Sequence, residues 1–328
     1  MIADNLKTRI DSLVQSTWPN AAVDSMDLVQ GLWSDYGAIV RVSLSASDKH
    51  PSSFVAKVVV PPNESSHPRG WNTDASHQRK LKSYAVETRF YEHYAVQCKE
   101  DCAVAACYAS DVNDDGVTLF LEDLDVDFPV RHSSLSVAEA EVCLKWLAAF
   151  HALFMGSRDD GVWPTGTYWH LDTRQDELAA MEDGELKQAA QKLDTVLNST
   201  EFRTLLHGDA KVANFCFSDD GDAVSAVDFQ YTGHGCGMRD VAYFLGSCLD
   251  QESLQAHEDE LLDMYFNALG NRFPAMRAAL EKEWRPLYAV AGADFHRFLA
   301  GWSPGHTKLT AYSGELVKQA LGHIENPS

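Results

Sequence analysis

The sequence predicts an α+β fold in which a small, strand-rich N-terminal part precedes a larger, mostly helical part. In the first third of the chain, short apolar stretches with alternating polar residues indicate strands, with one helix among them. Beyond it, apolar residues recur at helical spacing, and one hairpin interrupts the helices. A polar, acidic stretch at residues 122–127 separates the two patterns and predicts a lobe boundary near residues 122–128.

Length and composition fit a globular protein with two cores. The chain has 328 residues, of which 45% are hydrophobic. Its formal net charge of −21 and the lack of any Lys/Arg block argue against nucleic acid or an anionic membrane surface as a partner. The sequence has no apolar signal region, no window long enough for a membrane span and no CxxC pair among its 7 cysteines. We therefore expect a cytoplasmic protein with reduced thiols.

Each element of the N-terminal part has its own local signal. Alternation predicts strands at residues 38–44 and 54–60, the second ended by two prolines. An irregular loop rich in Pro, Ser, His and Asn is expected at residues 61–78, followed by a helix at residues 81–94. Apolar segments on both sides of the turn at residues 113–116 predict a hairpin.

The same turn allows a competing interpretation as a calcium loop. Asp111, the acidic residues after it, Gly116 and Glu122 satisfy the EF-hand pattern. Residues 117–121 are apolar and partly β-branched, which favours a strand over the helix that an EF-hand requires, and no second loop accompanies them. A zinc site at the loosely clustered cysteines of residues 98–107 lacks a second pair of ligands. We prefer the hairpin.

The C-terminal part begins with a clear helix signal. Ser136 and Glu139 form a capping box, and apolar residues follow on one face. Later, two apolar runs flank a turn cluster that contains Gly221 and predict a hairpin. If the turn centres near Gly221, Asn214 and Asp228 lie opposite one another, about 5 Å apart, and both can bind one cation.

The residues around this hairpin carry the chemistry. Asp209 follows a His-Gly dipeptide, Asn214 lies five positions later, and Asp228 follows the hairpin. This order provides what a magnesium-nucleotide phosphotransferase needs to hold its metal and orient a hydroxyl. Asp and Asn are also common in loops, where they bond their own backbone. The interpretation therefore depends on the ordered residues upstream.

Lys57 is the first of these upstream residues. It lies in a valine-rich strand, where alternation gives it the same face as Val55 and Val59. An ammonium shielded from water needs a partner or a ligand, and Glu87 on the following helix is the natural partner. Alternatively, Lys57 lies on an edge strand and both side chains face water.

An ordered set of residues resembles the pattern of the aminoglycoside phosphotransferase and choline kinase group, which has a bilobal protein kinase-like fold. The set consists of Lys57, Glu87, residues 121–124, His207-Gly-Asp209, Asn214 and Asp228-Phe-Gln230. The Asp-Phe-Gln ending and residues 240–247 look most like its ecdysteroid kinase-like branch. The resemblance extends from about Gly31 to Ser247. It implies an N-lobe at residues 1–121, a hinge at residues 122–128 and a helical C-lobe at residues 129–328.

The resemblance implies a kinase that uses ATP and Mg²⁺ to move the γ-phosphate to a hydroxyl of a small-molecule acceptor. Asp209 would accept or orient the hydroxyl proton, while Asn214 and Asp228 would bind magnesium. Lys57, fixed by Glu87, would hold the α and β phosphates. The hinge, including Glu122 and Leu124, would bind adenine through backbone groups. Lys211 would neutralise the transferred phosphoryl group, or it is a solvated loop lysine.

Some features leave the interpretation open. The Gly-rich loop is thin, with only Gly31 and Gly37 at its ends, and Gln230 stands where protein kinases have glycine. Asp240 either braces the catalytic loop or caps a helix. A nucleotide-binding scaffold without transfer, or nucleotidyl transfer to protein, are the alternative functions. Candidates for acceptor contact are Trp169, His170, Arg174, Asp294, His296, Arg297 and Trp302.

Overall fold

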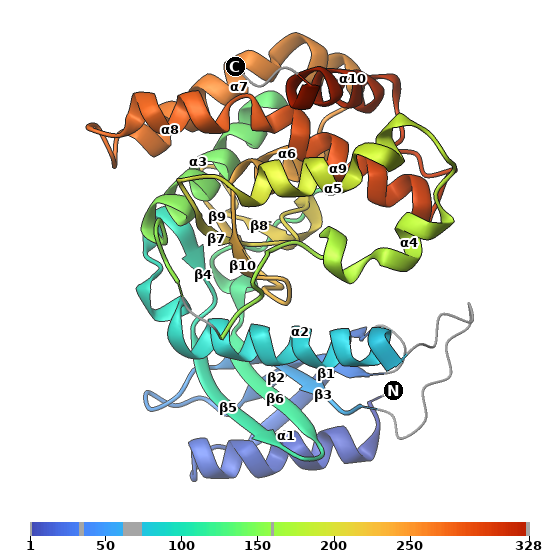
Figure 1. Cartoon of the computed structure of the whole chain (residues 1–328). Coiled ribbons are helices and arrows are strands. Elements are labelled where there is room, and N and C mark those ends of the chain that lie inside the picture. The colour runs from blue at the N-terminus through green and yellow to red at the C-terminus, as the bar shows by residue number, and fades with distance from the viewer. Residues whose placement is uncertain (1, 33–35, 62–73, 159–160, 326–328) are drawn as a thin grey trace. The chain divides into compact units, whose positions relative to one another are not determined.

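The computed structural model describes residues 2–32, 36–61, 74–158 and 161–325 (Figure 1). The chain divides into two compact units. The first comprises residues 1–97 and 104–127, and the second comprises residues 98–103 and 128–328. The first is built on a sheet and the second mostly on helices, which confirms the expected α+β fold.

The first unit contains a five-stranded sheet in the order β1-β2-β3-β6-β5. All neighbouring strands are antiparallel, and β5 and β6 form the hairpin expected around residues 113–116. The strands are β1 (Val23–Gly31), β2 (Gly37–Leu44), β3 (Ser53–Val59), β5 (Cys107–Asn113) and β6 (Gly116–Glu122).

Two helices, α1 (Asp4–Thr17) and α2 (Asp74–His93), cover opposite faces of this sheet (Figure 1). The prediction of a single helix in this part was wrong, because α1 was missed and α2 begins at Asp74, inside the expected loop. The first turn of α2 is mostly polar and gives no apolar periodicity. The remaining loop residues, 62–73, lie outside the described residues.

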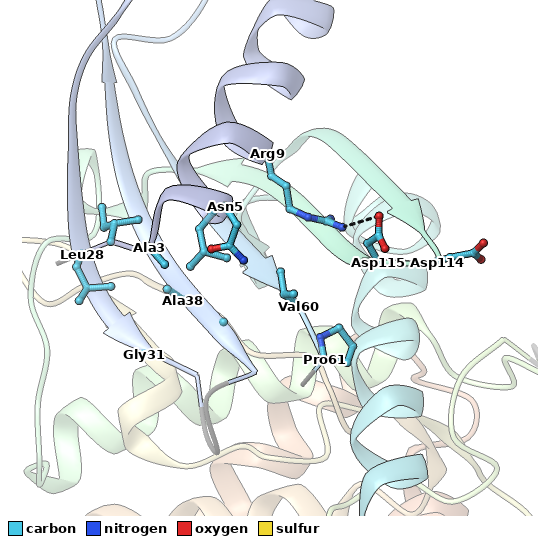
Figure 2. Close-up of a pocket in the computed structure, with 13 residues that line it drawn as sticks. Ala3, Asn5, Arg9, Leu28, Gly31, Ala38, Val60, Pro61, Asp114 and Asp115 are labelled. Carbon is cyan, nitrogen blue, oxygen red and sulfur yellow. Dashed lines mark ion pairs between the residues drawn. The ribbon is translucent and has the colours of Figure 1, made fainter. Parts of the chain in front are cut away.

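The α1 face of the sheet has a hollow of about 890 Å³ at the ends of β1, β2 and β3 (Figure 2). Arg9 of α1 lies in it, 4.0 Å from a carboxylate oxygen of Asp115 and 3.1 Å from Oδ1 of Asn113, to which it donates. Lys57 does not line this hollow, since its neighbours Ala56 and Val58 point into the α1 core. Lys57 therefore projects from the other face of the sheet, toward α2.

The second unit is mostly helical. Its helices are α3 (Val137–Leu153), α4 (Gln175–Ala180), α5 (Glu185–Asn198), α6 (Met238–Cys248), α7 (Gln251–Gly270), α8 (Arg277–Trp284), α9 (Leu287–Trp302) and α10 (Ala311–Glu325). Its antiparallel ribbons pair β7 (Thr204–Leu206) with β10 (Gly233–Gly235), and β8 (Phe215–Phe217) with β9 (Val224–Ala226). A short strand, β4 (Ala103–Val104), lies where the chain passes between the units. None of the described helices combines the length and apolarity that crossing a bilayer requires.

The capping box predicted for α3 is present. The Oγ of Ser136 accepts a hydrogen bond from the backbone N–H of Glu139, and the Glu139 carboxylate accepts one from the N–H of Ser136 at 2.7 Å. The two bonds satisfy backbone donors that a helix start otherwise leaves free. The helix then buries Cys143, Leu144 and Leu147 completely, as its apolar spacing predicts.

A buried ionic network fastens three helices of the second unit. Arg239 of α6 lies 3.0 Å from a carboxylate oxygen of Asp294 on α9 and 3.4 Å from one of Asp194 on α5. Arg297 donates to the same Asp294 and to the backbone carbonyl of Trp169. Removal of one partner would leave a buried charge without compensation, which is strongly destabilising. The ion pairs therefore hold α5, α6 and α9 together.

Candidate active site

Asp209 lies in a tight loop that directly follows β7. Pairing of β7 with β10 places Leu206 opposite Gly233, and the chain then turns at Gly208, whose φ is +83°. A Cβ atom on Gly208 would lie 1.9 Å from the backbone oxygen of Tyr231. Only glycine fits this position, because both the backbone conformation and the lack of space exclude a side chain. The turn thereby fixes where the Asp209 carboxylate lies.

Asp240 in the first turn of α6 braces this loop. Its two carboxylate oxygens accept the backbone N–H groups of His207 and Gly208 at 2.7 and 3.0 Å. Nε2 of His151 lies 3.1 Å from the same carboxylate. Of the two roles left open by the sequence, the brace is therefore the one observed, whereas the N-cap position of α6 belongs to Gly237.

The His207 side chain supports the loop from within. It is fully buried, and burial lowers its pKa, so the ring is neutral near neutral pH. Its Nδ1 accepts the backbone N–H of Asp209 at 3.2 Å, so the proton resides on Nε2, which donates to the carbonyl of Val227 at 3.0 Å. His207 thus ties the loop of Asp209 to the residue that precedes Asp228.

The Asp209 carboxylate receives three side-chain hydrogen bonds. Nζ of Lys211 donates to Oδ2 at 2.8 Å, and Nδ2 of Asn214 donates to the same oxygen at 3.1 Å. The hydroxyl of Tyr243 on α6 donates to Oδ1 at 3.1 Å. Donors on both oxygens hold the carboxylate in one orientation, as a base that must meet a hydroxyl requires.

The pKa of the Asp209 carboxyl lies close to neutral pH. Burial raises the pKa of its carboxyl to about 6, the Lys211 ammonium opposes this rise and the Asp228 carboxylate adds to it. Burial lowers the pKa of Lys211, but the adjacent Asp209 outweighs that effect and leaves the pKa above its ordinary value. Near pH 7 Asp209 is therefore ionised, with a pKa suited to general-base work.

The hairpin that carries Asn214 and Asp228 differs from the expected register by one residue. Phe215 pairs with Ala226, and the N–H of Val227 donates to the carbonyl of Asn214 at 3.0 Å. Val227, not Asp228, therefore lies opposite Asn214, which corrects the prediction. The reason is the loop at residues 219–222, which has an even number of residues, so the turn is not centred on Gly221.

The side-chain oxygens of Asn214 and Asp228 nevertheless suit a hard cation. Both hydrogens of the Asn214 amide are used, for the backbone oxygen and Oδ2 of Asp209, so its Oδ1 is the atom that could bind a metal. Asp228 has a left-handed backbone with φ of +71° and is half-buried. Its charge is close enough to raise the pKa of Asp209. One amide and one carboxylate oxygen match Mg²⁺, which usually completes its octahedron with phosphates and water.

In the first unit, Lys57 and Glu87 form a buried ion pair. Nζ of Lys57 on β3 lies 2.8 and 2.7 Å from the two carboxylate oxygens of Glu87 on α2. Only 5% of Lys57 and 2% of Glu87 is exposed, so the alternative of two solvated side chains is wrong. Nζ also lies 5.9 Å from the ring centroid of Tyr84. The pair keeps an ammonium in an apolar environment at a fixed position.

The predicted hinge residues lie at the end of β6 and in the short turn that follows it. Glu122 ends β6, and its carboxylate accepts the N–H of Ala106 at 3.0 Å. Leu124 is buried and begins a short 3-10 turn, η4 (Leu124–Val126), capped by Asp123. The backbone N–H of Glu122 and the carbonyl of Leu124 already have backbone partners. Adenine binding at this stretch stays a prediction.

At the thin glycine loop, Gly31 ends β1 and Gly37 begins β2, with the N–H of Leu32 donating to the carbonyl of Gly37 at 2.8 Å. Residues 33–35 lie outside the described residues. Gln230 follows Phe229, and its backbone carbonyl accepts the indole N–H of Trp163 at 2.8 Å.

The seven candidates for acceptor contact differ in exposure, with His170 buried and Arg174 and His296 half-buried. Trp169, Asp294 and Arg297 are fully buried in packing and ionic contacts of the second unit. Trp302, in contrast, is 41% exposed and stacks on Phe298. The buried group stabilises the fold and offers no surface to an acceptor.

Two residues beside Asp209 were missed. Tyr243 is three positions after Asp240, so both lie on one face of α6, and this helical spacing is a signal that sequence reasoning can use. Lys308, between α9 and α10, lies with its Nζ 5.4 Å from the ring centroid of Tyr243. It is far from Asp209 in the chain, and no local pattern connects them.

Residues 166–276 match the profile of the ecdysteroid kinase-like family. The match covers about a third of the chain and includes Asp209, Asn214, Asp228 and Tyr243. It confirms the resemblance expected from the sequence over this segment. No curated protein sequence matches the chain.

Solved structures resemble the chain over nearly its whole length. Choline kinase LicA from Streptococcus pneumoniae is similar with a TM-score of 0.54 and 12% identity, covering 98% of this chain and 99% of the other. The GDP complex of aminoglycoside 2'-phosphotransferase-IIIa gives a TM-score of 0.52 and 9% identity, with coverage of 97% and 99%. An amicoumacin kinase in complex with AMP-PNP and Ca²⁺ gives 0.50 and 13%, with 100% and 97% covered. The chain therefore has the protein kinase-like fold of these phosphotransferases.

Proposed function

We propose that this protein is a small-molecule kinase that uses ATP and Mg²⁺ to phosphorylate a hydroxyl of its acceptor. The observation that carries the proposal is the arrangement at Asp209: a buried carboxylate with a pKa of about 6, oriented by three donors, beside the oxygen ligands Asn214 and Asp228. Phosphoryl transfer needs little covalent chemistry from the protein, so positioning and charge neutralisation suffice.

In this proposal each side chain has one task. Asp209 accepts the proton of the acceptor hydroxyl, which enters within about 2.6–3.2 Å of the carboxylate. Lys211 and Tyr243 keep that carboxylate in place, and the Lys211 ammonium also offsets the negative charge that develops on the phosphoryl group. Lys57, fixed by Glu87, binds the α and β phosphates.

Magnesium, when bound, neutralises the phosphate oxygens and draws charge from the leaving group. Asn214 and Asp228 would hold it. Among the described residues no cluster of three His, Cys, Asp or Glu side chains forms a metal centre. Two protein ligands are consistent with a metal that arrives with its nucleotide, since Mg²⁺ is usually bound by one or two carboxylates together with substrate phosphates.

Two other functions use the same fold. A nucleotide-binding scaffold would bind ATP without transfer, and the thin glycine loop motivates this alternative. A nucleotidyl transferase would move AMP to a protein instead of moving the γ-phosphate to a small molecule. The ionised, oriented Asp209 favours the kinase, because a scaffold has no use for a base with a raised pKa.

The test is an ATP-consumption screen over a library of hydroxyl-bearing metabolites, with Asp209→Ala as the control. We expect turnover with at least one acceptor and a loss of about 10²- to 10⁴-fold in the variant, with ATP affinity little changed. Mass spectrometry of the products separates an added phosphate from an added nucleotide. No ATP consumption with any acceptor, or unchanged turnover in the variant, would overturn the proposal.

A further inference from the structure

Lys308 places a second cation beside the proposed base. Its Nζ lies 5.4 Å from the ring centroid of Tyr243, and the hydroxyl of that ring lies 3.1 Å from Oδ1 of Asp209. One phenol ring therefore separates the ammonium from the catalytic carboxylate. The charges of Asp209 and Lys211 act on Lys308, although burial and Cys248 act on it more strongly.

Within the described parts of the chain, this ammonium has no carboxylate partner. Lys211 has Asp209 at 2.8 Å, and Arg174 has Glu177 at 3.0 Å. For Lys308, no carboxylate oxygen of the described residues lies within ion-pair distance. Its side chain is half-buried, and burial lowers its pKa. A partly desolvated cation that rests on a ring face gains strongly from an anion supplied by a ligand.

The surroundings of Lys308 indicate what else such a ligand meets. Tyr168 and Tyr243 pack edge to face, Phe298 packs against Tyr168, and the exposed Trp302 stacks on Phe298. The hydroxyls of Tyr168 and Tyr243 lie 3.2 Å apart. Of these rings, Tyr243 and Phe298 are buried, Tyr168 is half-buried and Trp302 is exposed, so Tyr168 and Trp302 are the ones that can contact the body of a ligand.

We propose that Lys308 forms an anion-binding subsite of the acceptor pocket, so that the acceptor carries a carboxylate or another negative group besides the hydroxyl that is phosphorylated. This rests on the proposed kinase function. The hydroxyl meets Asp209 and the negative group meets Lys308, which one phenol ring separates. An acceptor with a positive group at this end is repelled by Lys308 and Lys211.

The test uses two acceptors that differ only in charge, 4-(hydroxymethyl)benzoate and its primary amide, within a panel of hydroxy acids and their amides. Ratios of kcat/KM for acid over amide are measured for the wild type, Lys308→Met and Lys308→Glu. We expect the wild type to prefer acids about 10- to 100-fold, the range for one hydrogen bond to a charged group. The Met variant should lose the preference, and the Glu variant should reverse it.

The matched control is Lys318→Met, since Lys318 is also a lysine of the C-terminal segment but is 73% exposed and pairs with Glu315. It should leave the acid-to-amide ratio unchanged. A Lys308→Met ratio equal to that of the wild type would overturn the subsite. A rise in KM for ATP that is equal for acids and amides would also overturn it, because Lys308 would then bind the nucleotide.

Calorimetric titration of 4-(hydroxymethyl)benzoate into the protein with Mg²⁺ and a non-hydrolysable ATP analogue separates this inference from the kinase proposal. Binding that weakens about 10-fold or more in Lys308→Met, without turnover of any acceptor, would refute the kinase but retain the anion site. Turnover of neutral acceptors, with equal benzoate binding by wild type and variant, would retain the kinase and refute the anion site.

Discussion

The hydroxyl of Tyr243 donates a hydrogen bond to Oδ1 of Asp209 at 3.1 Å, and this bond joins α6 to the loop that carries the proposed base. The same helix provides Asp240, which accepts the backbone N–H groups of His207 and Gly208. It also provides Ser247, whose hydroxyl accepts the N–H of Val212 at 2.8 Å. One face of α6 therefore fixes the loop on both sides of Asp209.

Replacement of Tyr243 by Phe should shift the pH dependence of turnover. The phenol hydrogen bond favours the ionised carboxylate, so its loss raises the pKa of Asp209 and moves the acidic limb of the kcat profile to higher pH. The measurement is kcat from pH 5 to 8 for the wild type, Tyr243→Phe and Tyr168→Phe. The Tyr168 variant keeps the bond to Asp209 and should shift less. Coincident limbs for Tyr243→Phe and the wild type would show that the bond is unimportant.

Asp209 should also make the stability of the protein depend on pH. Burial raises the pKa of Asp209 to about 6 in the folded state, so the carboxyl favours folding while protonated. That contribution is complete below its unfolded value near 4 and is lost as the pH rises through about 6. Relative to Asp209→Asn, which stays neutral, the wild type should therefore lose about 2 kcal/mol of stability between pH 4 and pH 7.

Urea denaturation of Asp209→Asn and the wild type at pH 4, 5, 6 and 7 measures this difference. The difference in stability should shift in favour of the variant as the pH rises over that range. A constant difference at all four pH values would mean that the carboxyl has an ordinary pKa in the folded protein.

Gly208→Ala should destabilise the loop severely. The added methyl group would lie 1.9 Å from the Tyr231 oxygen, and φ is +83°, so backbone movement is unavoidable. A loss above about 2 kcal/mol is expected, together with a large loss of turnover. Gly221→Ala is the matched control, because φ there is +76° but no atom lies within 4 Å of the added methyl. It should cost about 1 kcal/mol, and equal losses in the two variants would disprove the steric argument.

Lys57→Met should reduce both stability and ATP affinity. It leaves Glu87 buried without its partner, which costs about 3–5 kcal/mol. The double variant Lys57→Met/Glu87→Met should recover most of the stability, since no unpaired charge remains, but it should still bind ATP weakly. Urea denaturation and ATP titration of both variants provide the comparison. Wild-type ATP affinity in the double variant would remove Lys57 from the nucleotide site.

Local patterns were sufficient for several of these features. Alternation along β3 and the position of Glu87 on the next helix predicted the Lys57–Glu87 pair, and the capping box predicted the start of α3. The hairpin after Asn214 was predicted, but its register was wrong by one residue, because turn residues at 218–222 do not specify how many of them pair. The polar start of α2 gave no periodic signal.

Features that depend on tertiary packing could not be predicted. Lys308 meets Tyr243 only because α9 packs against α6 and α10 packs against α9, and no spacing in the sequence encodes that approach. The burial of Asp294 and Arg297 has the same origin. In the sequence each is a polar side chain that an acceptor could contact, but in the fold Asp294 pairs with both Arg239 and Arg297.

The most direct test of the phosphotransfer centre is calorimetric titration of ATP with and without Mg²⁺, for the wild type, Asp209→Ala and Asp228→Ala. We expect Mg²⁺ to strengthen ATP binding by the wild type and by Asp209→Ala, because the metal ligands remain, and to have little effect on Asp228→Ala. The same Mg²⁺ dependence in all three proteins would contradict the assignment of Asp228 as a metal ligand and, with it, the proposed centre.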